Sequence, residues 1–387
     1  IYLERTADGT GSTFTGDKET EGQLSVINEA IGIYSNGNNT LEDINITATG
    51  DKTTGVYIAG ESTVSGIVTA RGTNSVGAVG VYGSGGAVTI GTGGLTLNTD
   101  TGKGIGMYLT NGASTAGGTI IVNNTVTDVN NIGLYYSAGN ATNSSAISLI
   151  GSKSIGIYAG EGITLTNSAD ITSTAGKTEN IGSYVGGDSK LTSTGNITMA
   201  DNDSIGIYVE EGKGTNSGTI TMSGTASAQD KTVVGMVAKA GTGKIAIIEN
   251  ISEKEIIAGA NLGMYIAGTG TSSGKNTGKI TTTTGTGVYV DGATNSFDGT
   301  GGTITSGGVG ISLNGTAAGQ IKTGTLDIKP DGVGVYGNNA KIDFAVNVEG
   351  EGAVGVAAKG HSVISKDVTT GVGSVGVYVL DNSVSFN

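Results

Sequence analysis

The sequence repeats a five-residue phrase, seen clearly as Ile155-Gly156-Ile157-Tyr158-Ala159 and again as Ile205-Gly206-Ile207-Tyr208-Val209. The phrase reads apolar, Gly, apolar, Tyr, apolar, and it recurs fifteen times at steps of 21 to 29 residues. A glycine stands two positions before the Tyr marker in every copy, and twelve of the 14 tyrosines are markers. A period of this size predicts one stacked array of repeats over residues 1–387.

The markers are Tyr34, Tyr57, Tyr82, Tyr108, Tyr135, Tyr158, Tyr184, Tyr208, Tyr265, Tyr289, Tyr336 and Tyr378, with Val237, Ser312 and Ala357 replacing Tyr in three copies. Two interpretations of this ladder stay open. In the first, stacked rings stabilise successive repeats. In the second, exposed aromatic side chains form a strip that binds sugars or proteins. We favour the structural interpretation because the ladder is uniform along the chain.

The composition predicts an all-β protein. The chain has 72 Gly, one Pro and no Cys, so disulfides and thiolate metal sites are excluded. Gly is a poor helix former, whereas the abundant Thr, Val, Ile and Tyr favour strands. The net charge of −13 and the presence of two arginines, Arg5 and Arg71, disfavour nucleic acid as a partner. No apolar run approaches the roughly 20 residues of a membrane helix.

One period holds three short strands. Within residues 154–180, alternating apolar residues predict strands at 154–160, 163–166 and 171–173, separated by Gly, Asn and Ser turns. Leucine-rich repeats, propeller blades and calcium-binding nonapeptide arrays fit the period and residue pattern less well. The sequence therefore predicts a right-handed parallel β-helix, or β-solenoid, of about 15 coils of about 25 residues.

Two-residue alternation predicts which side chains enter the core. Positions −3, −1 and +1 relative to the marker are mostly apolar, as at Ile205, Ile207 and Val209, and we expect them to point inward. The Gly and the Tyr would then share the outer face.

Deviations from the regular period indicate candidate binding surfaces. The widest steps contain charged stretches near 4–23, 210–230 and 249–255, which we expect to form longer side loops. The candidate binding residues in these stretches are Glu4, Arg5, Lys18, Glu210, Glu211, Lys213, Glu253 and Lys254.

Catalytic chemistry has little support in the sequence. The one histidine, His361, is interpreted as a surface loop residue, and no activated serine motif accompanies it. The cluster Asp201-Asn202-Asp203 is interpreted as an Asx-rich turn, with a metal site as the minor alternative. We expect no catalytic residue, no cofactor and no metal site, and therefore no enzyme.

Iterated phrases such as Gly156-Ile157-Tyr158, second strands such as Asn216-Ser217-Gly218-Thr219-Ile220-Thr221, and the near absence of Pro, Trp and Cys resemble a known family. The whole chain resembles passenger domains of large monomeric (type V) autotransporter adhesins, above all those of fusobacteria. Both ends of the chain fall within the repeat, so we expect a fragment of a longer passenger.

The resemblance implies an exported, monomeric protein on the bacterial cell surface, tethered to the outer membrane by a C-terminal β-barrel missing from this sequence, or secreted. Its partners would be host-cell glycans, host surface proteins or neighbouring bacteria, and its role non-catalytic adhesion in virulence. A structural stalk that presents a distal tip is the first alternative, and a β-helical carbohydrate-active enzyme is the second.

Overall fold

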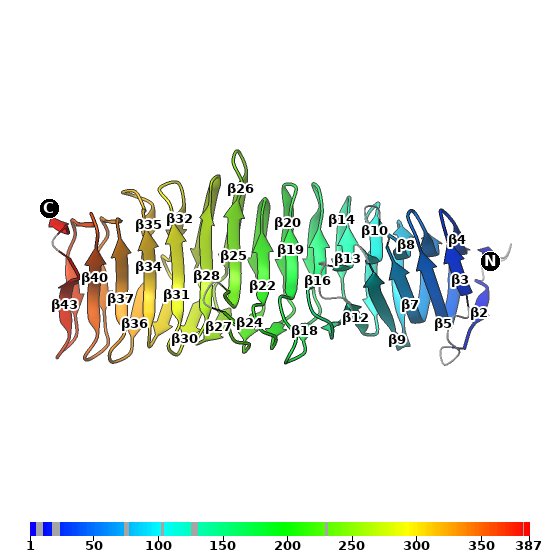
Figure 1. The fold of residues 1–387 in the computed structure, drawn as a ribbon, viewed down its shortest axis with the longest axis horizontal. Coiled ribbons are helices and arrows are strands. Elements are labelled where there is room, and N and C mark those ends of the chain that lie inside the picture. Colours follow the sequence, from blue (N-terminus) through cyan, green and yellow to red (C-terminus); the bar gives the residue numbers. More distant parts are fainter. Residues whose placement is uncertain are drawn as a thin grey trace. The chain divides into compact units, whose positions relative to one another are not determined.

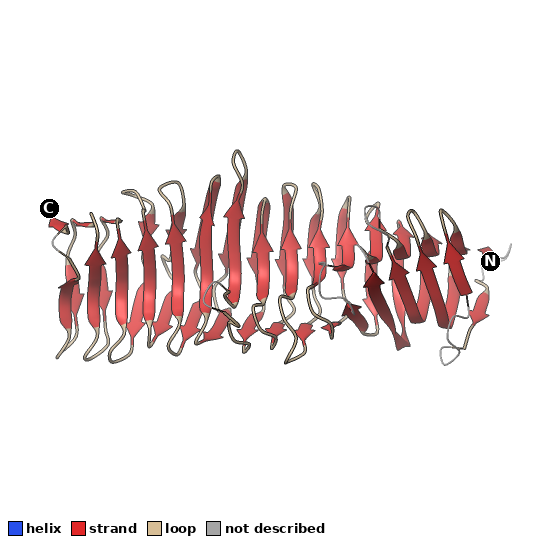
Figure 2. Ribbon diagram, in the orientation of Figure 1, coloured by secondary structure: helices blue, strands red, loops and turns tan. Residues whose placement is uncertain are grey.

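The computed structural model describes residues 1–4, 11–17, 24–72, 77–101, 104–124, 131–228, 231–381 and 383–387. These residues form strands and turns without a helix, so none of them makes a membrane-spanning helix (Figure 2). The chain divides into unit 1, Ile1–Asn196, and unit 2, Ile197–Asn387. Within each unit, successive coils pair in parallel, so the predicted parallel β-solenoid is confirmed (Figure 1).

Most coils contribute one strand to each of three walls, which we name wall A, wall B and wall C. Wall A carries the repeated phrase. In unit 1 it contains β1 (Tyr2–Glu4), β4 (Ile31–Asn36), β6 (Thr54–Ala59), β8 (Val79–Ser84), β10 (Ile105–Thr110), β13 (Asn131–Tyr136), β16 (Ser154–Ala159) and β19 (Ile181–Val185). In unit 2 it contains β22 (Ile205–Val209), β25 (Val234–Ala240), β28 (Leu262–Gly268), β31 (Thr286–Asp291), β34 (Val309–Asn314), β37 (Val333–Asn338), β40 (Val354–Lys359) and β43 (Val375–Val379).

Walls B and C complete the coils of unit 1. Wall B begins with β2 (Thr13–Thr15) and wall C with β3 (Leu24–Ile27). Three long strands then run through both walls: β5 (Asn39–Thr49), β7 (Ser62–Arg71) and β9 (Ala87–Thr101). Wall B continues with β11 (Ser114–Gly117), β14 (Asn140–Asn143), β17 (Thr164–Asn167) and β20 (Ser189–Ser193). Wall C continues with β12 (Ile120–Asn124), β15 (Ile147–Leu149) and β18 (Ile171–Ser173).

The same walls form in unit 2. Wall B contains β23 (Gly212–Asn216), β26 (Ile245–Asn250), β29 (Thr271–Asn276), β32 (Ser296–Asp298) and β35 (Ile321–Lys322). In the last coils the wall B position is taken by a separate three-stranded sheet of β38 (Lys341–Ile342), β41 (Val363–Ile364) and β44 (Ser385–Phe386). Wall C contains β21 (Ile197–Met199), β24 (Thr219–Met222), β27 (Glu255–Gly259), β30 (Lys279–Thr282), β33 (Thr303–Ser306), β36 (Thr325–Ile328), β39 (Val346–Val348) and β42 (Val368–Thr370).

The three strands predicted within 154–180 are confirmed as β16, β17 and β18. The predicted side loops are corrected in part. Residues 212–216 and 219–222 are strands β23 and β24, whereas the described residues 223–228 form no strand, as the prediction for 210–230 requires. The stretch 249–255 spans the end of β26, a four-residue turn and the start of β27. The extra residues between the markers Val237 and Tyr265 lengthen the strands of walls A and B. Residues in a strand form ladder hydrogen bonds that they would lack in a loop. Part of the first stretch, 5–10 and 18–23, lies outside the described residues.

The predicted facing of the phrase glycine is wrong. A Cβ built on Gly156 would lie 2.6 Å from the carbonyl oxygen of Gly182 and 3.5 Å from Leu149 Cδ2 in wall C. Its counterpart in unit 2, Gly206, would meet the carbonyl oxygen of Gly235 at 2.5 Å and Ile220 Cγ2 at 3.0 Å. The glycines therefore point into the core, and a side chain is excluded there by space, since no positive φ is recorded at these positions.

This arrangement also corrects the prediction for position −3. Residues at −1, such as Ile157 and Ile207, are 0% exposed, as predicted. Residues at −3 lie mostly on the outer side, and Ile205 is only partly buried. Strict alternation fails because the Gly and the residue after it both face inward, so the residue before the Gly is displaced outward. The ladder pairing skips the Gly in the same way, linking Ile105 to Ile132 and Met107 to Leu134.

The marker tyrosines stack outside wall A. In unit 1 the rings of Tyr2, Tyr34, Tyr57, Tyr82, Tyr108, Tyr135, Tyr158 and Tyr184 form a continuous series with centroid distances of 4.6 to 5.2 Å. In unit 2, Tyr265 and Tyr289 stack at 5.5 Å. Each interior ring shares both faces with neighbouring coils, and such pairs contribute beyond the area that they bury.

Buried asparagines stack along the corner where wall B ends. In unit 2, Asn216 Nδ2 donates to Asn250 Oδ1, and Asn250 Nδ2 donates to Asn276 Oδ1, both at 2.8 Å. In unit 1, Asn143 Nδ2 donates to Asn167 Oδ1 at 2.6 Å. Because these side chains are 0% exposed, a shift of one coil against the next would leave amide groups buried without partners.

We predict that Gly206→Ala destabilises the protein by about 1–3 kcal/mol, because the added methyl overpacks the core against the Gly235 carbonyl. Gly241→Ala is the matched control, since its Cβ would meet only Lys244 Cδ at 3.7 Å and its φ is ordinary. Urea unfolding measures both variants. Equal stabilities for the two variants would contradict the inward facing of Gly206.

We predict that Tyr158→Ala lowers the free energy of unfolding by about 1–3 kcal/mol, because it removes two stacked pairs. Tyr158→Phe keeps the ring and should retain most of the stability. Thermal unfolding of the two variants separates the ring from its hydroxyl. A Tyr158→Ala variant with the wild-type melting temperature would show that stacking contributes nothing.

Candidate functional site

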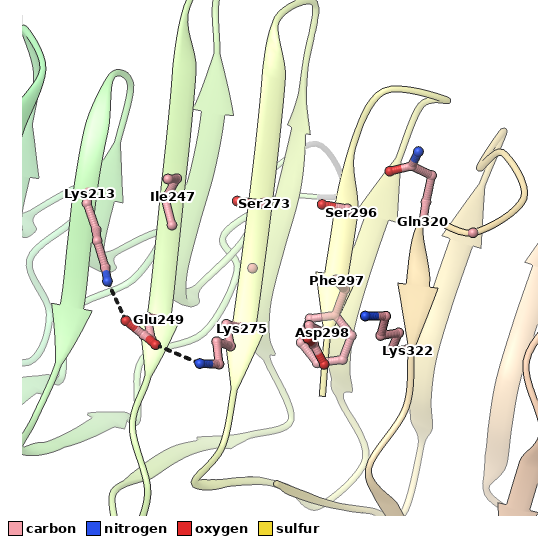
Figure 3. A pocket seen from close by; sticks show the side chains of 12 residues that line it. Lys213, Ile247, Glu249, Ser273, Lys275, Ser296, Phe297, Asp298, Gln320 and Lys322 are labelled. Carbon is pink, nitrogen blue, oxygen red and sulfur yellow. Dashed lines mark ion pairs between the residues drawn. The ribbon is translucent and has the colours of Figure 1, made fainter. Parts of the chain in front are cut away.

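The candidate site is a groove of about 580 Å³ on the outer face of wall B in unit 2 (Figure 3). It crosses five successive strands, β23, β26, β29, β32 and β35. The residues that line it are Lys213, Ile247, Glu249, Ser273, Gly274, Lys275, Ser296, Phe297, Asp298, Gly319, Gln320 and Lys322.

Parallel pairing aligns the charged residues in one row. Glu249 pairs with Lys275, Lys275 with Asp298, and Asp298 with Lys322, so the charge alternates from coil to coil. A second row two residues earlier is mostly uncharged and pairs Lys213 with Ile247, Ile247 with Ser273 and Ser273 with Ser296. Both rows face outward because they occupy alternate positions of their strands.

Ion pairs join Glu249 to one lysine of each row. Glu249 accepts Lys213 Nζ at 2.5 Å and Lys275 Nζ at 3.3 Å, as Figure 3 shows. Partial burial raises the pKa of Glu249, but hydrogen bonding and attraction from Lys213 and Lys275 outweigh it, and the net pKa is lowered. The pKa of Asp298 is lowered chiefly by a hydrogen bond from Thr300, with contributions from Lys322 and Lys275. Both carboxylates are therefore ionised at neutral pH.

The alignment depends on the core beneath it. Glu249 and Lys275 each precede a residue of the buried asparagine stack, Asn250 and Asn276, whose hydrogen bonds define the register. Phe297, 1% exposed, fills the interior below Asp298. Gly274 of the preceding coil leaves space for Ile266 of wall A, with which an added Cβ would collide. The side chains of the groove are thus presented by a rigid backbone.

The groove offers ammonium, carboxylate, hydroxyl and amide groups at the spacing of the coils, about 4.8 Å. Three lysines face two carboxylates, which gives a local excess of positive charge on a chain of net charge −13. This set of donors and acceptors suits a hydroxyl-rich or acidic ligand.

The predicted binding residues are distributed over different places. Lys213 lies in the groove, whereas Glu210 and Glu211 lie at the turn before β23 and pair with Lys244 at 3.5 and 3.3 Å. Glu4 is exposed at the end of β1. Arg5 and Lys18 lie outside the described residues.

Glu253 and Lys254 are not part of the groove. They lie in the turn between β26 and β27, where Lys254 N–H donates to the Ile251 carbonyl at 3.2 Å. Sequence reasoning missed Lys275, Asp298 and Lys322, because each falls in a coil of ordinary length. A usable signal exists, since Glu249 and Lys275 directly precede the asparagine that ends their wall B strand.

The other sequence candidates form turns. Asn202 Oδ1 accepts from the Thr225 N–H and Oγ1 at 3.0 Å each, and Asp203 accepts from Ser227. His361 is exposed between β40 and β41. No group of three or more His, Asp or Glu side chains suited to a metal ion occurs in the part of the chain that the structure describes.

Fold and groove together define a parallel β-solenoid with a polar groove on one lateral face. No protein-family model matches the chain, and no curated protein matches it. Among solved structures it is similar to the A-module of the mannuronan C-5 epimerase AlgE6 of Azotobacter vinelandii, with 11% identity. The match covers 86% of this chain and 89% of that one at a TM-score of 0.31, which supports no inference about activity.

We predict that Glu249→Gln lowers stability by about 1 kcal/mol at neutral pH. Because the folded-state pKa is lowered, this contribution is present above the unfolded pKa and is lost as the pH falls through the folded pKa. The difference from wild type should therefore shrink at pH values below the ordinary 4.5. Urea unfolding across pH 7 to about 3 measures it, with Glu253→Gln, on an exposed turn, as control. A difference that grows on acidification would contradict the ion-pair account.

Proposed function

We propose that this chain is a non-catalytic adhesive segment of a bacterial surface passenger, extracellular and monomeric, that binds host-cell glycans or proteins or neighbouring bacteria. The observation that carries the proposal is the wall B groove, an open surface on which five coils present charged and hydroxyl groups in register. The repeated phrase and its resemblance to autotransporter passengers supply the setting.

The electrostatics of the groove support binding over catalysis. A β-helical carbohydrate-active enzyme that uses a carboxyl group as general acid would need that group to hold a proton near neutral pH, which requires a raised pKa. The neighbouring lysines lower the pKa of Glu249, and the hydrogen bond from Thr300 lowers that of Asp298. Such carboxylates act well as hydrogen-bond acceptors for hydroxyl or ammonium groups.

A structural stalk is the alternative that a specific observation favours. The tyrosine stack of unit 1 continues from Tyr2 to Tyr184 without interruption, which is the uniformity that a spacer requires. The two roles are compatible in one passenger, but they predict different behaviour for the isolated chain.

The test uses the purified chain, fluorescently labelled, on host epithelial cells and on partner bacteria. We expect saturable binding that falls at least tenfold in the double variant Lys275→Gln and Lys322→Gln. The matched control, Lys190→Gln with Lys341→Gln, removes two exposed wall B lysines outside the groove and should bind as wild type. Absence of binding in every format would contradict the adhesive role and leave the stalk. Unaltered binding by the groove variant would place adhesion elsewhere.

A further inference from the structure

The marker position lacks a tyrosine in three coils of unit 2, and two of these gaps are filled. Val237, between Tyr208 and Tyr265, is 3% exposed, so its branched side chain closes the space itself. Ala357, next to Tyr336, is 6% exposed, and Lys359 of the same strand places its Nζ 5.8 Å from the centre of the Tyr336 ring. The first gap is therefore closed by the Val237 side chain and the second by Lys359.

The third gap, at Ser312, has no ring or cation over it among the residues described in unit 2. Ser312 pairs with Tyr289 on one side and with Tyr336 on the other, and it remains partly accessible to solvent. The far face of Tyr289 is covered by the Tyr265 ring, and the far face of Tyr336 by Lys359. The two faces that look towards Ser312 have no ring partner among the residues described in unit 2. We name the space between them the Ser312 slot.

The slot has the thickness of one aromatic ring. Tyr289 and Tyr336 are two coils apart, which amounts to two rises of about 4.8 Å each. A ring stacked about 3.5 Å from each neighbour occupies about 7 Å of that span, so one ring fits and two do not. The spacing expected for a ring in the slot can be compared with the observed stack, in which the centroids of adjacent rings lie 4.6 to 5.5 Å apart.

The rim of the slot is polar. Asn314 Nδ2 donates to Asp291 Oδ1 at 2.7 Å, and Asn338 Nδ2 donates to Asn314 Oδ1 at 2.8 Å. These three side chains lie two residues beyond the markers of their coils, on the same outer face of wall A. The Tyr289 hydroxyl also hydrogen-bonds Asn314, so a phenol stacked in the slot would lie beside this row of polar groups.

We propose that the Ser312 slot binds the phenol ring of a tyrosine side chain presented by a protein partner, between Tyr289 and Tyr336. Every neighbouring rung of the stack that carries a ring carries a phenol, so the slot matches the group that the Ser312 coil lacks. This inference does not depend on the adhesive role proposed for the wall B groove, which lies on another wall.

The test is saturation-transfer NMR with p-cresol and with N-acetyl-tyrosinamide on the intact chain. A single sandwiched ring should bind with a dissociation constant of about 1 mM. Ser312→Tyr supplies the ring internally and should weaken p-cresol binding at least tenfold while raising the melting temperature. Ser312→Leu blocks the slot without an aromatic ring and should weaken binding in the same way.

Val237→Tyr is the matched control, because it adds a tyrosine at a marker whose gap is already closed, and it should leave p-cresol binding unchanged. N-acetyl-leucinamide and cyclohexanol should show no transfer. Undiminished p-cresol binding by both Ser312 variants would overturn the proposal. So would transfer to a methyl pyranoside in place of p-cresol, or no transfer to p-cresol at about 10 mM, well above the expected constant.

Discussion

The rest of each solenoid unit depends on a close approach between wall A and the core at the phrase glycine. A hydrogen atom fits where a methyl group would collide with the carbonyl oxygen of the next glycine, as between Gly55 and Gly80 or between Gly287 and Gly310. Since the same contact recurs from coil to coil, the glycines form a ladder inside the protein. Branched side chains of wall C, such as Ile304 beside Gly287, then pack over the exposed backbone.

The tyrosine ladder follows from this approach, and an asparagine ladder in wall B accompanies it. Bringing two consecutive residues inward resets the alternation of the strand, so the marker tyrosines two residues after the glycine face out. Tyrosines at that position consequently meet at stacking distance. At the corner where wall B ends, buried asparagines join successive coils by side-chain hydrogen bonds. These bonds resist a shift of one strand along its neighbour. Apolar, aromatic and amide ladders thus specify one register together.

Register is also what creates the candidate surfaces. Glu249, Lys275, Asp298 and Lys322 are 23 to 26 residues apart in sequence and adjacent in wall B. The Ser312 slot arises in the same manner, because the loss of one ring matters only when its two neighbours remain in the stack. In a solenoid, a single substitution in one coil therefore changes a surface that three successive coils form together.

The sequence alone determined the class of fold, since a period of 21 to 29 residues with three alternating segments leaves few architectures other than a parallel β-solenoid. It also determined the strands of the 154–180 coil and the outer position of the marker tyrosines, because local alternation and turn residues encode them. The tertiary structure decided that the glycines face inward and that Ile205 and its equivalents face out. It also decided that the charged residues of ordinary coils form a groove while Glu253 and Lys254 stay apart from it. These features depend on contacts between residues one coil apart and across the core, and local periodicity carries no information about the space left at such contacts.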